Sequence, residues 1–273
     1  MLVNLSQVLS IAEQESIAIP AFNVYNLETA LGVAHAAEAL YAPVIFQVYS
    51  RLFTNNLAQY LAPSILKLIE DLPVPCAFHL DHGASMAEVQ KALRSGASGI
   101  MIDASKWELD ENIRLTKEVV TLCSSVGVPV EGELGHVGTT KDAVQAEYTK
   151  VDEAVWYVQE TGVAALAVMI GTAHGRYLQA PKLDIKRLSE IANATRIPIV
   201  LHGGSGIPDD QIRQAITSGV RKVNFGTDVC YSFLNSVRST SEDIVGVDLF
   251  MKEPTAAVEA FAREKITLLR TKL

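Results

Sequence analysis

Three short segments of the chain place a histidine beside a glycine, each directly after an apolar, strand-like run. Three neutral imidazoles with one open position are a common catalytic zinc arrangement. We therefore predict that His82, His174 and His202 bind one divalent metal ion. Asp81, beside the first of them, is expected either to transfer a proton or to orient that ligand. The segments are HLDHG at 79–83, GTAHG at 171–175 and LHGGSG at 201–206.

Other acidic and histidine side chains are weaker candidates for the same site. Glu131 and Glu133 lie on one side of an expected strand, because side chains alternate along a strand with period two. Glu133 is expected to be an alternate metal ligand or a base that holds a histidine. Asp103, after another strand, is expected to support the structure. A structural role also suits His79 inside a strand, whereas the role of His136, in a polar loop, stays open.

The glycine-rich turn at 203–206 is a candidate phosphate site. Its backbone amides open a helix after the seventh expected strand, which is where α/β barrels commonly bind phosphate. Pro208 is expected to occupy the first position of that helix. The same glycines are equally consistent with a plain turn, so their spacing alone leaves both interpretations open.

Eight short apolar runs alternate with helix-like segments along the chain. The runs are mostly continuous Val, Ile, Leu and Ala, which favours parallel strands covered on both faces. We expect an α/β protein, a single (β/α)8 TIM barrel domain spanning 1–273 with an extra C-terminal helix. A doubly wound open sheet is the second choice, although no GxGxxG follows the first run. The expected strands are 17–22, 44–48, 74–80, 99–102, 128–133, 165–170, 197–201 and 220–225.

Polar residues gather at one end of these expected strands. In TIM barrels the chemistry lies at the C-terminal ends of the strands. Prolines and apolar residues stand at the opposite ends, so the distribution is one-sided and predicts that the candidates converge on one rim. The residues at the C-terminal ends are Asn23, Asp81, His82, Asp103, Glu133, His174, His202 and Asn224.

Composition argues against some kinds of partner. The net charge is −8 and Lys and Arg form no cluster, so nucleic-acid binding is not expected. No apolar run is long enough to span a membrane, and the first residues lack the pattern of a secretory signal. Three widely spaced cysteines without a CxxC motif are typical of reduced thiols. We expect a cytoplasmic protein.

Seven stretches together resemble the class II, zinc-dependent ketose-bisphosphate aldolases, most closely the tagatose-bisphosphate type. They occur in the family's order and cover nearly the whole chain. Each alone is a weak signal, whereas the set is highly specific. The stretches are AFNVYNLET at 21–29, HLDHG at 79–83, GIMIDAS at 99–105, VEGELG at 130–135, IGTAHGRY at 170–177, VLHGGSGIP at 200–208 and KVNFGTD at 222–228.

The resemblance implies reversible aldol cleavage of a phosphorylated ketose to dihydroxyacetone phosphate and an aldehyde. For a tagatose-1,6-bisphosphate-like substrate the aldehyde is glyceraldehyde 3-phosphate. The resemblance also implies zinc on the three histidines, Asp81 exchanging the C4 hydroxyl proton, a monovalent cation (Na⁺ or K⁺) near the phosphate, and a homodimer or homotetramer. The residues expected to bind the substrate are Asn23, Gly175, Gly203, Gly204, Ser205, Asn224, Phe225, Gly226 and Thr227.

Three departures from the family pattern bear on the substrate. Gly226 stands where fructose-bisphosphate members have an aspartate, which argues against a preference for fructose bisphosphate. Lys141 stands where many members carry a loop glutamate that handles a proton. VDLFMKE at 247–253 replaces an Asp-Pro-Arg whose arginine reaches the distal phosphate from a neighbouring subunit. Arg51 and Lys252 are then the candidates for the distal end.

Other functions stay open at this level. The nearest alternative is an aldolase for a phospho-ketose or keto-deoxy sugar acid phosphate without a second phosphate. A metal-dependent isomerase or epimerase would use the same enediolate chemistry without breaking a carbon–carbon bond. A non-catalytic sugar-phosphate-binding barrel would have the same fold. The intact set of Asp81 and three histidines argues against this last alternative.

Overall fold

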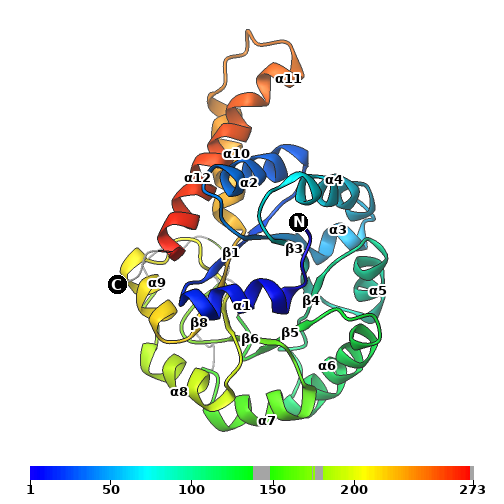
Figure 1. The fold of residues 1–273 in the computed structure, drawn as a ribbon, viewed down its shortest axis with the longest axis vertical. Helices are drawn as coiled ribbons and strands as arrows, with labels where there is room; N and C mark the ends of the chain where they lie inside the picture. Colours follow the sequence, from blue (N-terminus) through cyan, green and yellow to red (C-terminus); the bar gives the residue numbers. More distant parts are fainter. Residues whose placement is uncertain (138–147, 174, 176–180, 271–273) are drawn as a thin grey trace.

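Eight parallel strands close into a barrel in the computed structural model, with β8 pairing back onto β1. The structure describes residues 1–137, 148–173, 175 and 181–270. Helices surround the barrel (Figure 1). The closed sheet confirms the expected (β/α)8 architecture and excludes the doubly wound alternative. The strands are β1 (Ile19–Asn23), β2 (Val44–Tyr49), β3 (Cys76–Gly83), β4 (Gly99–Ile102), β5 (Val130–Leu134), β6 (Ala165–Val168), β7 (Ile199–Leu201) and β8 (Val220–Phe225).

The strands lie close to the predicted runs, with one difference that matters for the site. β8 has the predicted bounds, and β6 ends at Val168, two residues before the predicted end at 170. β3 continues to Gly83, so His82 lies inside the strand rather than after it. The register between β3 and β4 shifts between Leu80 and Gly83, which marks a bulge beside the histidine.

Only some of the described helices that surround the barrel have a side-chain cap at their start, among them α1, α2, α5 and α8. The side chain of Asn26 caps α2, and the side chain of Ser85 caps α5. Pro208 was predicted as the first residue of α9, but its ψ of 139° is extended, so it is the N-cap instead. The helices are α1 (Leu5–Glu15), α2 (Leu27–Ala39), α3 (Ser50–Thr54), α4 (Ala58–Asp71), α5 (Met86–Arg94), α6 (Leu109–Ser124), α7 (Val151–Thr161), α8 (Ile185–Thr195), α9 (Asp209–Thr217), α10 (Thr227–Ser239), α11 (Val247–Phe250) and α12 (Lys252–Arg270).

α1, which was not predicted from the sequence, closes the N-terminal end of the barrel (Figure 1). A capping box fixes its start, because Asn4 and Gln7 exchange hydrogen bonds between side chain and backbone. Its buried face packs against apolar side chains that point into the barrel from β1, β2, β3, β6 and β7. The floor of the barrel consists of Leu5, Val8, Leu9, Ala12, Ile17, Ile19, Ala21, Ile45, Ala77, Ala165, Ala167 and Val200.

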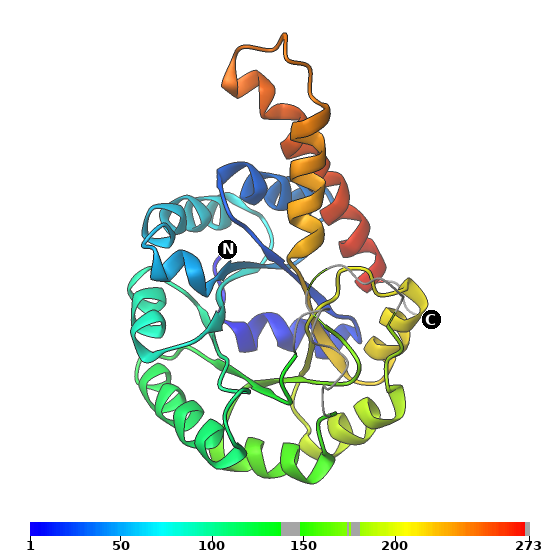
Figure 2. The same cartoon turned by 180° about the vertical axis from the view of Figure 1, so that it is seen from behind.

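The extra C-terminal structure is an arm rather than one helix. α10, α11 and α12 project beyond the barrel, and α12 returns along α2 (Figures 1 and 2). Val258, Ala262 and Ile266 of α12 are buried, whereas Val245 and Val247 near the tip of the arm are 89% and 71% exposed. Among the described residues, no helix is long and apolar enough to cross a membrane.

Candidate metal and catalytic site

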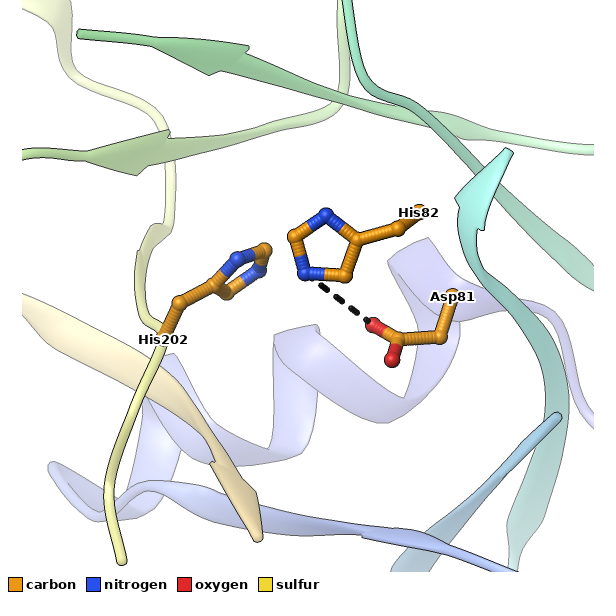
Figure 3. A group of neighbouring side chains, drawn as sticks. All are labelled: Asp81, His82 and His202. Carbon is orange, nitrogen blue, oxygen red and sulfur yellow. Dashed lines mark ion pairs between the residues drawn. The ribbon is translucent and has the colours of Figure 1, made fainter. Parts of the chain in front are cut away.

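His82 and His202 face each other at the C-terminal rim of the barrel (Figure 3). Their ring centroids are 4.8 Å apart, and the planes meet at 65°. Asp81 Oδ1 lies 4.0 Å from His82 Nε2. One ligand atom from each of the three buried residues falls within 4.8 Å of the others. Two of the predicted metal ligands and the predicted proton-transfer residue therefore converge.

Asp81 and His82 are neighbours in one strand, yet both side chains line the same cavity. Regular alternation would point them to opposite faces of the sheet. The bulge in β3 and the φ of 49° at His82 break that alternation. A left-handed backbone costs a residue with a side chain about 1–2 kcal/mol, so the surrounding structure must stabilise it. Asp103 contributes, because its Oδ2 lies 2.9 Å from His82 Nδ1.

His202 lies between two carboxylates from β5. Its Nε2 is 2.9 Å from Glu131 Oε1, and its Nδ1 is 3.2 Å from Glu133 Oε2. This confirms that Glu131 and Glu133 lie on one side of the strand. Burial alone would lower the pKa of His202, but these carboxylates outweigh it and raise the pKa to about 10. Charges that favour a cationic imidazole here would also favour a bound metal cation.

Lys222 and Glu131 form a fully buried ion pair below the two histidines, with Nζ 2.7 Å from Oε2. Lys222 helps to lower the pKa of Glu131 against the opposing effect of burial. His79 Nε2 is 3.6 Å from the same carboxylate, but burial lowers the pKa of this imidazole to about 3, so it is neutral. Lys222 was not predicted as a site residue, although a lysine in a mostly apolar strand is a signal of a functional role.

Amide side chains hold the carboxylate of Asp81. Asn23 donates to Oδ2 at 2.7 Å, and Asn224 donates to Oδ1 at 3.3 Å. Burial by itself would raise the pKa of Asp81, but the imidazoles of His82 and His202 act against it and the pKa is lowered. The carboxylate is therefore ionised and can accept a proton. Asn23 and Asn224 act on the predicted catalytic group as well as lining the cavity.

Ser105, which was not singled out in the sequence, connects the supports of the two histidines. Its hydroxyl lies 2.7 Å from Asp103 Oδ1 and 3.0 Å from Glu133 Oε1. The Nδ1 atom of His136 lies 3.1 Å from the same hydroxyl. Asp103 is thus a support for His82, as expected, and His136 belongs to the rim of the site.

A cavity of about 360 Å³ opens over these residues. Gly175, Gly203, Ser205, Gly226 and Thr227 line it after β6, β7 and β8. Side chains from β2 and the following α3 line it as well. There the Arg51 guanidinium lies 5.4 Å and 5.3 Å from the ring centroids of Tyr25 and Tyr49. The exposed Lys106, after β4, lines the same cavity.

The predicted phosphate turn is only partly available to a ligand. Gly203 and Ser205 line the cavity, but the Gly204 amide donates to the Asn224 carbonyl at 3.1 Å. A Cβ at Gly204 would come within 2.6 Å of Val223, so close packing explains this glycine. Phe225 was also expected to contact the substrate, but its side chain is fully buried and stacks on Phe22. Ser205 and Asn224, the polar neighbours of these two residues, line the cavity, whereas Gly204 and the Phe225 ring do not.

The remaining predicted site residues are not placed at the site. His174 and Lys141 lie outside the described residues. Lys252 is exposed at the start of α12, and it is not among the described residues that line the cavity. Within the described part of one chain, Arg51 is therefore the distal-end candidate that the fold brings to the cavity.

The donor set at the rim fits a divalent cation. A second cluster, His82, Asp103 and Glu133, also offers ligand atoms within 4.8 Å of one another, and it shares His82 with the first. Imidazole nitrogens and carboxylate oxygens in a buried site are ligands that zinc and related ions accept. Glu133 Oε2 lies 3.2 Å from His202 Nδ1 and 3.8 Å from His82 Nδ1, which is close enough for an alternate ligand to the same ion.

Comparison with known proteins agrees with this architecture. Residues 3–272 match the family described as fructose-bisphosphate aldolase class-II. A 6-phospho-5-dehydro-2-deoxy-D-gluconate aldolase from Shouchella clausii (strain KSM-K16) is 36% identical over 272 residues, 97% of this chain and 93% of the relative. The uncharacterized protein YdjI from Escherichia coli (strain K12) is 37% identical over 261 residues, 94% of this chain and 93% of that protein.

Solved structures give the same result. The crystal structure of the YdjI aldolase from Escherichia coli K12 matches with a TM-score of 0.90 and 34% identity, covering 98% of this chain and 97% of that one. A putative fructose-1,6-biphosphate aldolase from Coccidioides immitis has a TM-score of 0.90 and 29% identity, over 97% and 96% of the two chains.

The chain belongs to the class II fructose-bisphosphate aldolase family. It is an aldolase, a carbon–carbon lyase that acts on a phosphosugar. The family assignment agrees with the resemblance seen in the sequence, while the finer tagatose-bisphosphate type stays a prediction.

Proposed function

We propose that this chain reversibly cleaves a phosphorylated ketose with a second anionic group to dihydroxyacetone phosphate and an aldehyde, using zinc. The position of Asp81 carries the proposal. Its carboxylate lies 4.0 Å from His82 Nε2 in the wall of a cavity of about 360 Å³. A proton acceptor and a candidate metal site thus meet in a cavity of a size suited to a small ligand.

His82 and His202, with His174 from the sequence, would hold the zinc ion, and Glu133 is the alternate ligand. A divalent ion there would polarise the substrate carbonyl and stabilise the negative charge that develops as the carbon–carbon bond breaks. Asp103 orients the ring of His82, and Glu131 orients the ring of His202.

Asp81 takes the C4 hydroxyl proton in the cleavage direction. The electron pair of that O–H bond forms the aldehyde carbonyl, the C3–C4 bond breaks, and its electrons pass to the C2 ketone to leave an enediolate. A proton from water added at C3 then gives dihydroxyacetone phosphate. Asn23 and Asn224 hold the carboxylate, and its lowered pKa keeps it ionised, the form that can act as a base. In the reverse direction the protonated carboxyl returns the proton to the former aldehyde oxygen, which becomes the C4 hydroxyl.

The phosphate of the dihydroxyacetone phosphate half would bind where the turn after β7 meets the start of α10. The Ser205 hydroxyl accepts a hydrogen bond from the Asp228 backbone amide at 3.2 Å, which ties the two segments together. Amides at a helix N-terminus favour an anion. Gly175, Gly203 and Thr227 complete this end of the cavity, and a Na⁺ or K⁺ ion would lie nearby.

The position of Arg51 at the cavity is the evidence for an anionic group at the distal end of the substrate. The two tyrosine rings restrain its guanidinium at the cavity, and Lys106 adds a second cation. The distal anion is either the second phosphate of a tagatose-bisphosphate-like ketose or the carboxylate of a keto-deoxy sugar acid phosphate. The name of the Shouchella clausii relative specifies a substrate of the second kind.

A coupled assay for release of dihydroxyacetone phosphate tests the proposal directly. The panel comprises tagatose 1,6-bisphosphate, fructose 1,6-bisphosphate, 6-phospho-5-dehydro-2-deoxy-D-gluconate and a monophosphate ketose with a neutral tail. We expect release from a substrate with a distal anion, the neutral-tailed ketose being the poorest. Conversion of these ketoses to isomers without release of dihydroxyacetone phosphate would instead indicate an isomerase or epimerase.

We also propose that the chain works as a single-domain homodimer or homotetramer in the cytoplasm. Large apolar side chains on the arm support a contact with another copy, because exposed apolar patches often mark interaction surfaces. These are Tyr231, Leu234, Val245, Val247 and Leu249. The cysteines Cys76, Cys123 and Cys230 are free thiols, in keeping with a reducing compartment.

A further inference from the structure

The ion pair of Lys222 and Glu131 spans the barrel interior. Lys222 comes from β8 and Glu131 from β5, strands that are not neighbours in the sheet. Both side chains are fully buried, and Nζ lies 2.7 Å from Oε2. Burying an ammonium group is costly unless it is paired. A lysine at this depth therefore calls for an explanation beyond packing.

Hydrogen-bond geometry links the pair to His202. The Lys222 ammonium can only donate, so it occupies Glu131 Oε2 as an acceptor. Glu131 Oε1 lies 2.9 Å from His202 Nε2. An ionised carboxylate can only accept, so Nε2 must carry a hydrogen.

The other nitrogen of the ring faces the rim. His202 Nδ1 lies 3.2 Å from Glu133 Oε2, in the cluster that also contains His82. If Nε2 carries the hydrogen, Nδ1 is the atom of a neutral imidazole that can bind a metal ion. The orientation and the tautomer of His202 thus depend on Glu131 remaining an acceptor at both oxygens.

We propose that Lys222 is a positioning residue for the metal site: by neutralising Glu131 it fixes the His202 ring with Nε2 protonated and leaves Nδ1 to bind the metal. The inference rests on the proposed metal role of His202. Lys222 touches neither metal nor substrate in this scheme and acts through Glu131. His79 does not replace it, because its Nε2 is 3.6 Å from Oε2, beyond hydrogen-bond distance.

Zinc affinity of the Lys222→Met variant tests the inference. Loss of an outer partner of a metal ligand typically weakens metal binding about 10- to 100-fold. We expect a change of that size in the Zn²⁺ dissociation constant, measured by competition with a chelator on metal-stripped protein. Val220→Ala, in the same strand and also fully buried, is the matched control. It should lose stability while keeping the wild-type zinc affinity.

A second variant separates positioning from folding. Lys222→Met combined with Glu131→Gln removes both charges, so it should regain stability in urea denaturation, because no unpaired charge stays buried. Its zinc affinity should remain at least about 10-fold weaker than wild type. Wild-type affinity in the double variant, or in the single variant, would show that Lys222 serves folding alone.

His202→Ala distinguishes failure of the inference from failure of the proposed function. If this variant binds zinc like the wild type, His202 is not a ligand and the metal site itself is wrong. If it loses zinc while Lys222→Met does not, only the role of Lys222 is overturned.

Discussion

The two ends of the barrel are built from the same strands but differ in chemistry. The floor is closed by α1 and by aliphatic side chains such as Leu9 and Ile19. The rim holds buried Asp81, Glu133 and two histidines, and His82 has a left-handed backbone. One end therefore stabilises the fold, and the other contains strain and charge that folding alone would not favour.

The Lys222–Glu131 pair lies between these two ends and shows how they are joined. Glu131 binds Lys222 through one oxygen and His202 through the other. Strands held by an apolar floor can thus fix the orientation of a rim histidine through one buried charge pair. Substitutions at the floor and at the rim should separate stability from activity, and the following predictions test that separation.

Asp81→Ala is expected to have the largest effect on activity. Loss of a general acid–base group typically lowers turnover about 10²- to 10⁴-fold. Zinc content and the urea midpoint should stay close to wild type, because Asp81 is a proton acceptor rather than a main support of the fold. The turnover number for release of dihydroxyacetone phosphate checks the prediction. Near-normal turnover would show that Asp81 does not transfer the proton.

Leu9→Ala should have the opposite profile. Leu9 is 1% exposed in the floor, and replacing a buried leucine by alanine typically costs about 2–5 kcal/mol. The free energy of unfolding should fall by that amount in urea denaturation, while kcat/KM of the folded enzyme stays unchanged. A lowered kcat/KM with unaltered stability would contradict the division between floor and rim.

Arg51→Ala should alter the choice of substrate without altering the fold. A hydrogen bond to a charged group contributes about 1.5–3 kcal/mol, so kcat/KM should fall about 10- to 100-fold for substrates with a distal anion. The same variant assayed with a neutral-tailed ketose phosphate is the control and should match wild type. An equal loss with both substrates would remove Arg51 from the distal end.

Gly226→Ala is expected to have the smallest effect. An added Cβ would lie 3.1 Å from Asn23 Oδ1 and 3.5 Å from the Tyr25 hydroxyl, so Asn23 must shift by a few tenths of an ångström. Because Asn23 holds Asp81, turnover should fall roughly two- to tenfold, less than the 10²-fold loss that a 1 Å misplacement can cause. Unchanged kinetics would mean that the rim tolerates this shift.

The barrel and much of its rim could be predicted from the sequence because their signals are local. Continuous apolar runs gave the strands, and β8 has the predicted bounds. α1 was not predicted, although its buried residues Leu5, Val8, Leu9 and Ala12 have helical spacing. Gly204 and Phe225 were expected to contact the substrate because they stand in a matching motif. Packing accounts for the missing side chain of Gly204 and for the position of the Phe225 ring, and their contact with the substrate stays a prediction.

By itself the sequence determined the fold class, the family and the identity of the chemical groups at the rim. Only the tertiary structure decided how those groups act together. Adjacent residues Asp81 and His82 line one cavity because a bulge and a positive φ rotate the backbone, which no spacing rule shows. Lys222 reaches Glu131 because barrel closure brings two distant strands to opposite sides of one interior. Contacts of this kind depend on the whole sheet, so no local pattern in the chain contains them.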